Sequence, residues 1–460
     1  MRMTRADLLL KNGTIVTSDG FFKGNIVVND GRITAIDQGN CYQGNIEIDA
    51  GEKYILPGGV DPHVHIREPG RPDRETFQTG TMAAAAGGVT TILEHPISEP
   101  PPYNGDILRK RKAAAKPQAF VDYAFYGAAS AKHRHEIGPL AEQGIAAFKT
   151  FLHEPPPGRE IEFEGLTMGH DGEILEGFQA ISQTGFMCAV HAENNAIIQA
   201  NIRKLKDQNR RDGMAHPASR PPITEIETVS KILLFAKETG TPVEFCHIST
   251  PEAMAMIRTA KSEGQQVYLE TCPHYLFLDH SLMDTQGPYV KFNPPLRSKA
   301  SRDKLWDYIH DGTVDFIGSD HSPFLLKEKE AGTTDIFAAP PGLPSLELRL
   351  PLMLNAVHEG KLTLPKVVEL LSENTAKIFN LYPQKGAVQV GSDADFVIVD
   401  LDAPWTIDIS KMYTKARDIL KLFNGWAVTG KPVTTILRGR IVMENQQVDP
   451  SAEGWGKLLI

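Results

Sequence analysis

Short apolar runs alternate with stretches of helical character through the middle of the chain. Segments of helical character that follow these runs include 171–184, 223–239, 251–263 and 301–311. Strands of a parallel barrel are buried on both faces and are therefore apolar throughout, so the pattern over residues 55–383 predicts an α/β fold, a (β/α)8 TIM barrel. The apolar runs that predict its strands are 55–60, 89–94, 121–127, 145–151, 186–191, 243–247, 267–271 and 314–318.

The two ends of the chain show a different pattern, in which short strands are joined by tight turns. Asn12-Gly13 and Asn29-Asp30-Gly31 each separate two apolar runs. They predict hairpins, because these residues tolerate positive φ. Neither end has enough strands for a core of its own. We therefore predict that residues 1–54 and 384–460 pack together as one β domain, and that residues 55–383 form the barrel.

Composition and charge narrow the class of protein. The chain has 460 residues, of which 41% are apolar and 23% charged, a balance that allows a large buried core. The net charge of −9 leaves no basic stripe for a nucleic-acid backbone. No segment approaches the roughly 18 apolar residues of a membrane span, and we expect no signal peptide. The four cysteines form no CxxC pair, so we predict a cytoplasmic protein without nucleic-acid or membrane partners.

Polar side chains that could bind metal fall at or near the C-terminal ends of five predicted strands, where such a barrel carries its chemistry. Each also has a structural interpretation. A lone histidine is more often a hydrogen-bonded core residue, the lysine could extend to the rim, and the aspartate could cap a helix. We favour metal binding, because independent structural roles would not place six such residues at one rim. The residues are His63, His65, Lys149, His191, His247 and Asp320.

This set of side chains suits a binuclear metal centre. Imidazole and carboxylate bind zinc or a similar divalent ion. The Lys149 amine must be neutral to take part, and burial beside cations lowers a lysine pKa from its reference value of about 10.4. A neutral amine can add CO2, and the two oxygens of the resulting carbamate could bridge two ions that hold a hydroxide. Asp320 would bind one ion and act as general base.

The motifs around these residues resemble the amidohydrolase superfamily, in its cyclic amidohydrolase branch of hydantoinases, dihydropyrimidinases, allantoinases and dihydroorotases. The resemblance covers nearly the whole chain and implies that the six residues hold two divalent ions, usually Zn²⁺, with Lys149 carboxylated from CO2 or bicarbonate. It also implies that the end segments form a β-sandwich and that the protein is a homodimer or homotetramer. The motifs are 59–65 (GVDPHVH), 85–91 (AAGGVTT), 148–149 (FK), 190–193 (VHAE), 247–249 (HIS), 293–297 (NPPLR) and 319–323 (SDHSP).

Other motifs bear on the substrate. Dihydroorotases bind the substrate carboxylate through three residues, and this chain keeps Arg67 but has Ile97 and Phe324 at the other two positions. An anionic dihydroorotate would therefore be held poorly. The segments that match allantoinases are 68–71, 79–81, 272–275 and 320–323, and those that match hydantoinases are 94–97, 324, 346–349 and 377–386.

The resemblance thus implies a metal-dependent cyclic amidase, a hydantoinase that opens a 5-substituted hydantoin to an N-carbamoyl amino acid. An allantoinase, which converts allantoin to allantoate, is the alternative. A dihydroorotase and a non-catalytic scaffold relative are less well supported. Our hypothesis is that the metal-bound hydroxide attacks the ring amide carbonyl, and that Asp320 passes the proton to the departing nitrogen.

Substrate contacts follow from the same resemblance. Many relatives place an oxyanion-stabilising tyrosine five residues after the carboxylated lysine, where this chain has Glu154. Ionised glutamate cannot donate that hydrogen bond, so either the metal alone polarises the carbonyl or His153 substitutes. Arg67 could equally form a salt bridge at the rim. The candidate substrate-binding residues are Asn293 and Gly342 for the imide edge of the ring, Leu152, His153 and Glu154 for the ring substituent, and Arg67.

Overall fold

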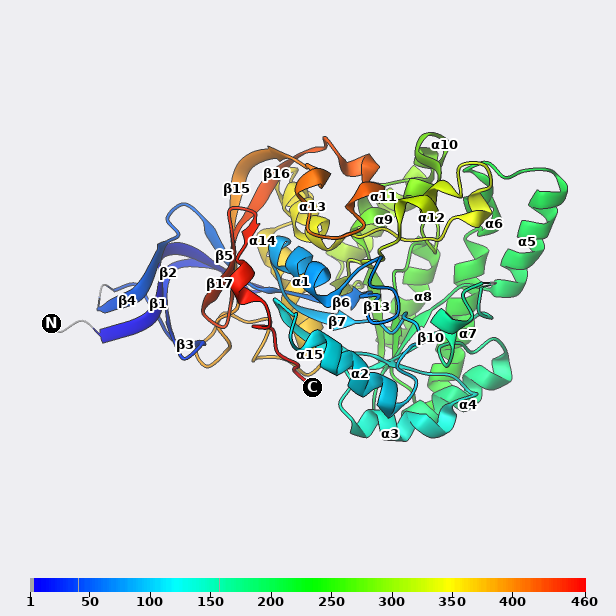
Figure 1. The fold of residues 1–460 in the computed structure, drawn as a ribbon, viewed down its shortest axis with the longest axis horizontal. Coiled ribbons are helices and arrows are strands. Elements are labelled where there is room, and N and C mark those ends of the chain that lie inside the picture. The colour runs from blue at the N-terminus through cyan, green and yellow to red at the C-terminus, as the bar shows by residue number, and fades with distance from the viewer. Residues whose placement is uncertain (1–3, 40, 157) are drawn as a thin grey trace.

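The computed structural model describes residues 4–39, 41–156 and 158–460, so residues 1–3 and 40 of the predicted terminal domain lie outside it. These ranges fold into a mixture of α-helices and three β-sheets. Figure 1 shows the strands of the two chain ends gathered on one side of the molecule and helices α4 to α7 on the other.

Strands from both ends of the chain form a nine-stranded sheet in the order β18-β17-β16-β15-β5-β1-β2-β3, with β4 paired to β1. At the junction β5 pairs antiparallel with β15, and Leu56 lies opposite Val397. The two ends therefore share one sheet, and β5 extends it across the boundary predicted after residue 54. The strands are β1 (Thr4–Thr17), β2 (Gly20–Asn29), β3 (Arg32–Asp37), β4 (Tyr42–Asp49), β5 (Tyr54–Pro57), β15 (Phe396–Thr406), β16 (Ala427–Leu437), β17 (Arg440–Glu444) and β18 (Gln447–Val448).

The two predicted hairpins have different outcomes. Asp30 and Gly31 have φ of 50° and 73° and connect β2 to β3, as predicted. At Asn12-Gly13 the hairpin prediction is wrong, because β1 continues through it to Thr17 with an irregular register. Asn12 has φ of 60° and its backbone N–H donates to Asn25 Oδ1 at 2.9 Å. The tolerance of positive φ that favours a turn serves equally well in a β-bulge.

Two parallel sheets occupy the middle of the chain. The first apolar run divides between β5 and the first of these strands at Gly58, and each of the other predicted runs overlaps a strand. A parallel bridge between Val64 and His321 connects the edges of the two sheets, and Tyr126 alone separates the strands at the other edge. The sheets are β6 (Gly59–Val64), β7 (Val89–Glu94) and β8 (Asp122–Phe125), and β9 (Gly127–Ala128), β10 (Phe148–Phe151), β11 (Cys188–His191), β12 (Val243–Phe245), β13 (Val267–Thr271) and β14 (Phe316–Ile317).

Helices connect most of the parallel strands. The four predicted helical segments correspond to α4, α7, α8 and α11, with ends that differ by at most two residues. In the described ranges no helix combines the length and the apolar character needed to cross a membrane. The helices are α1 (Phe77–Ala86), α2 (Gly105–Ala115), α3 (Ile137–Glu142), α4 (Asp171–Ser182), α5 (Asn195–Asp207), α6 (Ala215–Ser219), α7 (Ile223–Thr239), α8 (Pro251–Ser262), α9 (Pro273–Phe277), α10 (Met283–Gln286), α11 (Lys299–His310), α12 (Leu326–Glu330), α13 (Leu346–His358), α14 (Leu364–Val368) and α15 (Asn374–Ile378).

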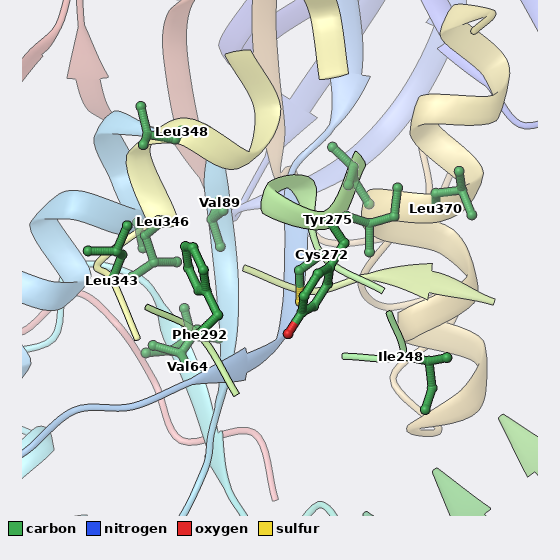
Figure 2. Close-up of a cluster of buried hydrophobic side chains, with 14 of the residues drawn as sticks. Val64, Val89, Ile248, Cys272, Tyr275, Phe292, Leu343, Leu346, Leu348 and Leu370 are labelled. Atoms are coloured by element: carbon green, nitrogen blue, oxygen red, sulfur yellow. The ribbon is translucent and has the colours of Figure 1, made fainter. Parts of the chain in front are cut away.

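The main apolar core joins side chains from distant parts of the chain. Figure 2 shows Val64 from β6 near Phe292 and Leu346, with Cys272 and Tyr275 beside them. Cys272 is buried and carries a free thiol, as expected of a cysteine that fills space in a core. This packing fixes the ends of the parallel strands, where the candidate site lies.

A buried charged cluster ties the terminal sheet to the parallel strands. Lys385 Nζ lies 2.5 Å from Asp122 at the start of β8, 3.0 Å from Asp393 and 2.7 Å from Asp395 near the start of β15. Burial alone would lower the pKa of Lys385, but the three carboxylates hold it above its ordinary value. The lysine is thus the shared counterion of three acidic groups at this junction.

Replacing this lysine should destabilise the fold strongly. We expect Lys385→Met to lower the free energy of unfolding by about 3–5 kcal/mol, because it leaves buried carboxylates without their cation. Denaturant unfolding of both proteins measures the difference. The exposed Lys411 provides the control, and Lys411→Met should change stability by less than about 0.5 kcal/mol. Equal stability of Lys385→Met and wild type would contradict this role.

Candidate functional site

The side chains predicted to bind metal meet where the parallel strands end. His63 Nε2 and His65 Nε2 each lie 3.4 Å from Asp320 Oδ1. At the end of β11, His191 Nδ1 lies 3.2 Å from His247 Nε2. The rings of His63 and His247 are 5.3 Å apart between centroids. Five of the six side chains therefore form two neighbouring groups of donor atoms.

The sixth side chain, Lys149, lies in β10 and is buried. Its Nζ donates to Cys246 Sγ at 2.9 Å and sits 5.0 Å from the centre of the Phe151 ring. Within the described part of the chain it has no carboxylate at ion-pair distance. A buried ammonium without a counterion is costly. The surroundings therefore suit a side chain that has been converted to an anion beside bound cations.

The charge states of these groups match a set of metal ligands. Burial lowers the pKa of His63 to about 3 and holds those of His65 and His247 well below the ordinary value. The imidazoles are therefore neutral, the form that binds a metal ion. Burial raises the pKa of Asp320 to about 6. Neutral nitrogens grouped around a carboxylate form a donor set that fits divalent ions such as zinc.

Two of the site residues have backbone conformations that are rare for residues with a side chain. His247 has φ of 42° and Asp320 has φ of 47°, in the left-handed region. Such conformations cost roughly 1–3 kcal/mol and persist where the surroundings hold them. Around Asp320 the backbone N–H of Ser319 donates to Asp61 Oδ1 at 3.1 Å, and that of His321 donates to His63 O at 3.3 Å.

Two carboxylates that sequence reasoning missed orient the histidines. Glu270 in β13 accepts from His63 Nδ1 at 2.8 Å and from the backbone N–H of His247 at 2.9 Å. Glu193 accepts from His191 Nε2 at 2.9 Å. Each contact leaves the other ring nitrogen free to bind metal. The available signal was a glutamate inside the apolar run 267–271, and another two residues after His191.

A cavity of about 1060 Å³ opens over the two groups. Its lining includes Asn293, Gly342, His153, Glu154 and Arg67, whose contact with substrate stays a prediction.

Leu152 departs from the prediction that it contacts substrate. It is buried in the main apolar core, whereas its neighbours Phe151 and His153 line the cavity. Successive residues of an extended segment point to opposite sides, so the central residue of this stretch points away.

The loop after β10 bears on stabilisation of the oxyanion. His153 Nδ1 donates to the carbonyl oxygen of Glu154 at 2.7 Å, and burial lowers the pKa of His153 to about 3. A neutral imidazole that donates from Nδ1 has only an acceptor at Nε2. In this conformation His153 therefore cannot replace the missing tyrosine. The Glu154 side chain is largely exposed and lies 3.6 Å from His170 Nε2.

Arg67 and Asn293 form part of the cavity wall. Arg67 Nη2 donates to Ser322 Oγ at 2.7 Å, and the guanidinium lies 5.0 Å from the centre of the Phe324 ring. Arg67 is buried and pairs with no carboxylate among the described residues, so it is not a rim salt bridge. In the amide orientation that pairs both atoms, Asn293 donates to Phe292 O at 3.0 Å and accepts from Arg220 at 3.1 Å.

Comparisons with known proteins agree on one family. The model of the Amidohydrolase family matches residues 54–442. An L-hydantoinase from Paenarthrobacter aurescens is 38% identical over 447 residues, 96% of this chain and 95% of the relative. An allantoinase from Desulfitobacterium hafniense is 33% identical over 449 residues, 97% of each chain. The solved structure of an L-hydantoinase (dihydropyrimidinase) from Arthrobacter aurescens matches with a TM-score of 0.93 and 37% identity, over 98% of this chain and 99% of that one.

Proposed function

The chain belongs to the amidohydrolase family, and from this we propose that it hydrolyses a five-membered cyclic ureide, opening a 5-substituted hydantoin to an N-carbamoyl amino acid. The observation that carries the proposal is the convergence of His63, His65, His191, His247 and Asp320 around buried Lys149 at the floor of a large cavity. The full-length similarity to hydantoinases supports the choice of ring.

We infer that the two parallel sheets are arcs of one (β/α)8 barrel over residues 55–383, with the sheet of the two chain ends belonging to a β-sandwich formed by residues 1–54 and 384–460. The bridge between Val64 and His321 supports closure on one side. The continuous run from β8 into β9 through Tyr126 supports it on the other.

The site residues divide naturally between two ions, which we propose to be Zn²⁺. His63, His65 and Asp320 would hold one, His191 and His247 the other, and a carbamate on Lys149 both. Two such ions would lower the pKa of a water molecule towards neutrality and polarise the carbonyl of the ring amide.

The chain's own groups would then position the substrate and move the proton. Asp320, at the floor of the cavity, would accept a proton from the attacking water at a carboxylate oxygen and deliver it to the departing ring nitrogen. Glu270 and Glu193 hold the histidines in the required tautomers. Gly342 fits this part of the cavity wall only as a glycine, because its φ is 115° and a Cβ there would lie 2.6 Å from the Ser322 side chain.

An allantoinase is the second candidate, supported by relatives of that name that match over nearly the whole chain. A ring-opening assay at equal concentrations of 5-benzylhydantoin, allantoin and dihydroorotate separates the candidates. With protein loaded with zinc and bicarbonate, we expect kcat/KM for the hydantoin to exceed the others roughly tenfold or more. Preference for allantoin would assign the second function, and inactivity on all three would contradict both.

We further propose that the protein is a cytoplasmic homodimer or homotetramer. The four cysteines, all free thiols, fit a reducing compartment. Light scattering after size-exclusion chromatography tests the oligomeric state, and a monomer would contradict it.

A further inference from the structure

His95 directly follows β7 and is completely buried beside the metal site. Its ring stacks on that of His63, with centroids 3.7 Å apart and planes 11° from parallel. The Tyr126 ring is also close, with its centroid 4.0 Å from that of His95. Neither ring nitrogen of His95 has a hydrogen-bond partner among the described residues. A buried polar atom left in this state costs about 1–3 kcal/mol, so a partner is to be expected.

The protein offers few candidates for that partner. A ring nitrogen of His95, a ring nitrogen of His63 and Cys246 Sγ all lie within 4.8 Å of one another. The nitrogens of His63 face Glu270 and Asp320. A thiol is a weak donor and acceptor. None of these groups therefore satisfies His95 well.

The Lys149 amine lies at the same place. Its Nζ is 2.9 Å from Cys246 Sγ, and this sulfur atom lies within 4.8 Å of a ring nitrogen of His95. Carboxylation would add two strong acceptor oxygens to this side chain. In either charge state an imidazole has at least one N–H to donate.

We propose that His95 is a positioning residue whose ring N–H donates a hydrogen bond to the carbamate of Lys149 and so stabilises the carboxylated lysine. The inference rests on the carbamate of the proposed function. In the carboxylation, the lone pair of Nζ forms a bond to the carbon of CO2, a C=O π pair moves onto oxygen, and one N–H proton leaves to solvent. The resulting anion is the acceptor that the buried imidazole lacks.

The alternative is that His95 only fills space against His63. Matched variants separate the two roles. His95→Met keeps an apolar filler of similar reach and removes the donor, whereas His95→Gln keeps an N–H donor and removes the ring. His274→Met is the control, because this buried histidine stacks on Phe292 with centroids 4.0 Å apart, and in the described part of the chain its ring packs on no metal-binding histidine.

The test measures the carbamate itself. Wild type and the three variants are reloaded with zinc over a series of ¹³C-bicarbonate concentrations, and the carbamate carbon is followed by NMR together with bound metal by mass spectrometry. Loss of a hydrogen bond to a charged group should raise the bicarbonate needed for half occupancy roughly 10- to 100-fold in His95→Met. His95→Gln should fall between that variant and wild type, and His274→Met should match wild type.

Two results would overturn the inference in distinguishable ways. A carbamate signal with the same bicarbonate dependence in wild type, His95→Met and His95→Gln would reject His95 alone and leave the proposed function intact. A wild-type protein that binds two ions without a carbamate signal would reject the carbamate as well.

Discussion

Lys149→Ala should lose tight binding of both metal ions and lower kcat by roughly three orders of magnitude or more, because the ions supply the activated water. In the proposed function, a carbamate on this amine joins the two groups of donor atoms. Its only hydrogen bond within the described residues goes to Cys246 Sγ. The side chain therefore contributes little else, and its removal should leave the melting temperature of the metal-free protein nearly unchanged.

Metal analysis and chemical rescue distinguish this role from general damage. Purified Lys149→Ala should contain less than one ion per chain by mass spectrometry. Acetate or propionate should restore part of the metal content and rate, since either can place a carboxylate between the two groups of donors. Retention of two ions and the full rate by the variant would refute the bridging carbamate.

Asp320→Asn should keep the fold and lower kcat about 10²- to 10⁴-fold, the usual contribution of a general acid–base group. The amide retains an oxygen close to His63 and His65 but cannot accept the proton of the attacking water. Because the proposed substrate contacts lie elsewhere on the cavity wall, KM should change little. Steady-state kinetics with metal content measured on the same sample provide the test.

The control for this substitution is Asp311→Asn, at the end of α11, whose carboxylate pairs with Arg258 at the surface. It should leave kcat unchanged. An Asp320→Asn enzyme with the wild-type rate would show that another group moves the proton.

The convergence of the predicted side chains could be foreseen because it follows from strand direction. Parallel strands bring their carboxyl ends to the same edge, so polar residues such as His191 and His247 at the ends of apolar runs must lie near each other. The roles of Glu270 and His95 could not be predicted in this way. Which side chain each of them meets depends on packing between strands that are far apart in sequence.

Local ambiguities in the sequence account for the other differences between the predictions and the structure. Asn12 could serve a turn or a bulge, and only the pairing of β1 with β2 decides between them. Leu152 lies between two cavity-lining residues but packs in the core. The types of the neighbouring residues do not indicate this orientation. The boundary after residue 54 falls inside β5, because that strand leads through Gly58 directly into β6.

The most direct test of the proposed reaction is mass spectrometry of 5-benzylhydantoin incubated with the protein loaded with zinc and bicarbonate. We predict a product heavier by one water molecule that comigrates with N-carbamoylphenylalanine, and no product after removal of the metal with a chelator. Unchanged substrate, in the presence of protein shown to hold two ions per chain, would contradict the assignment of a hydantoin-opening hydrolase.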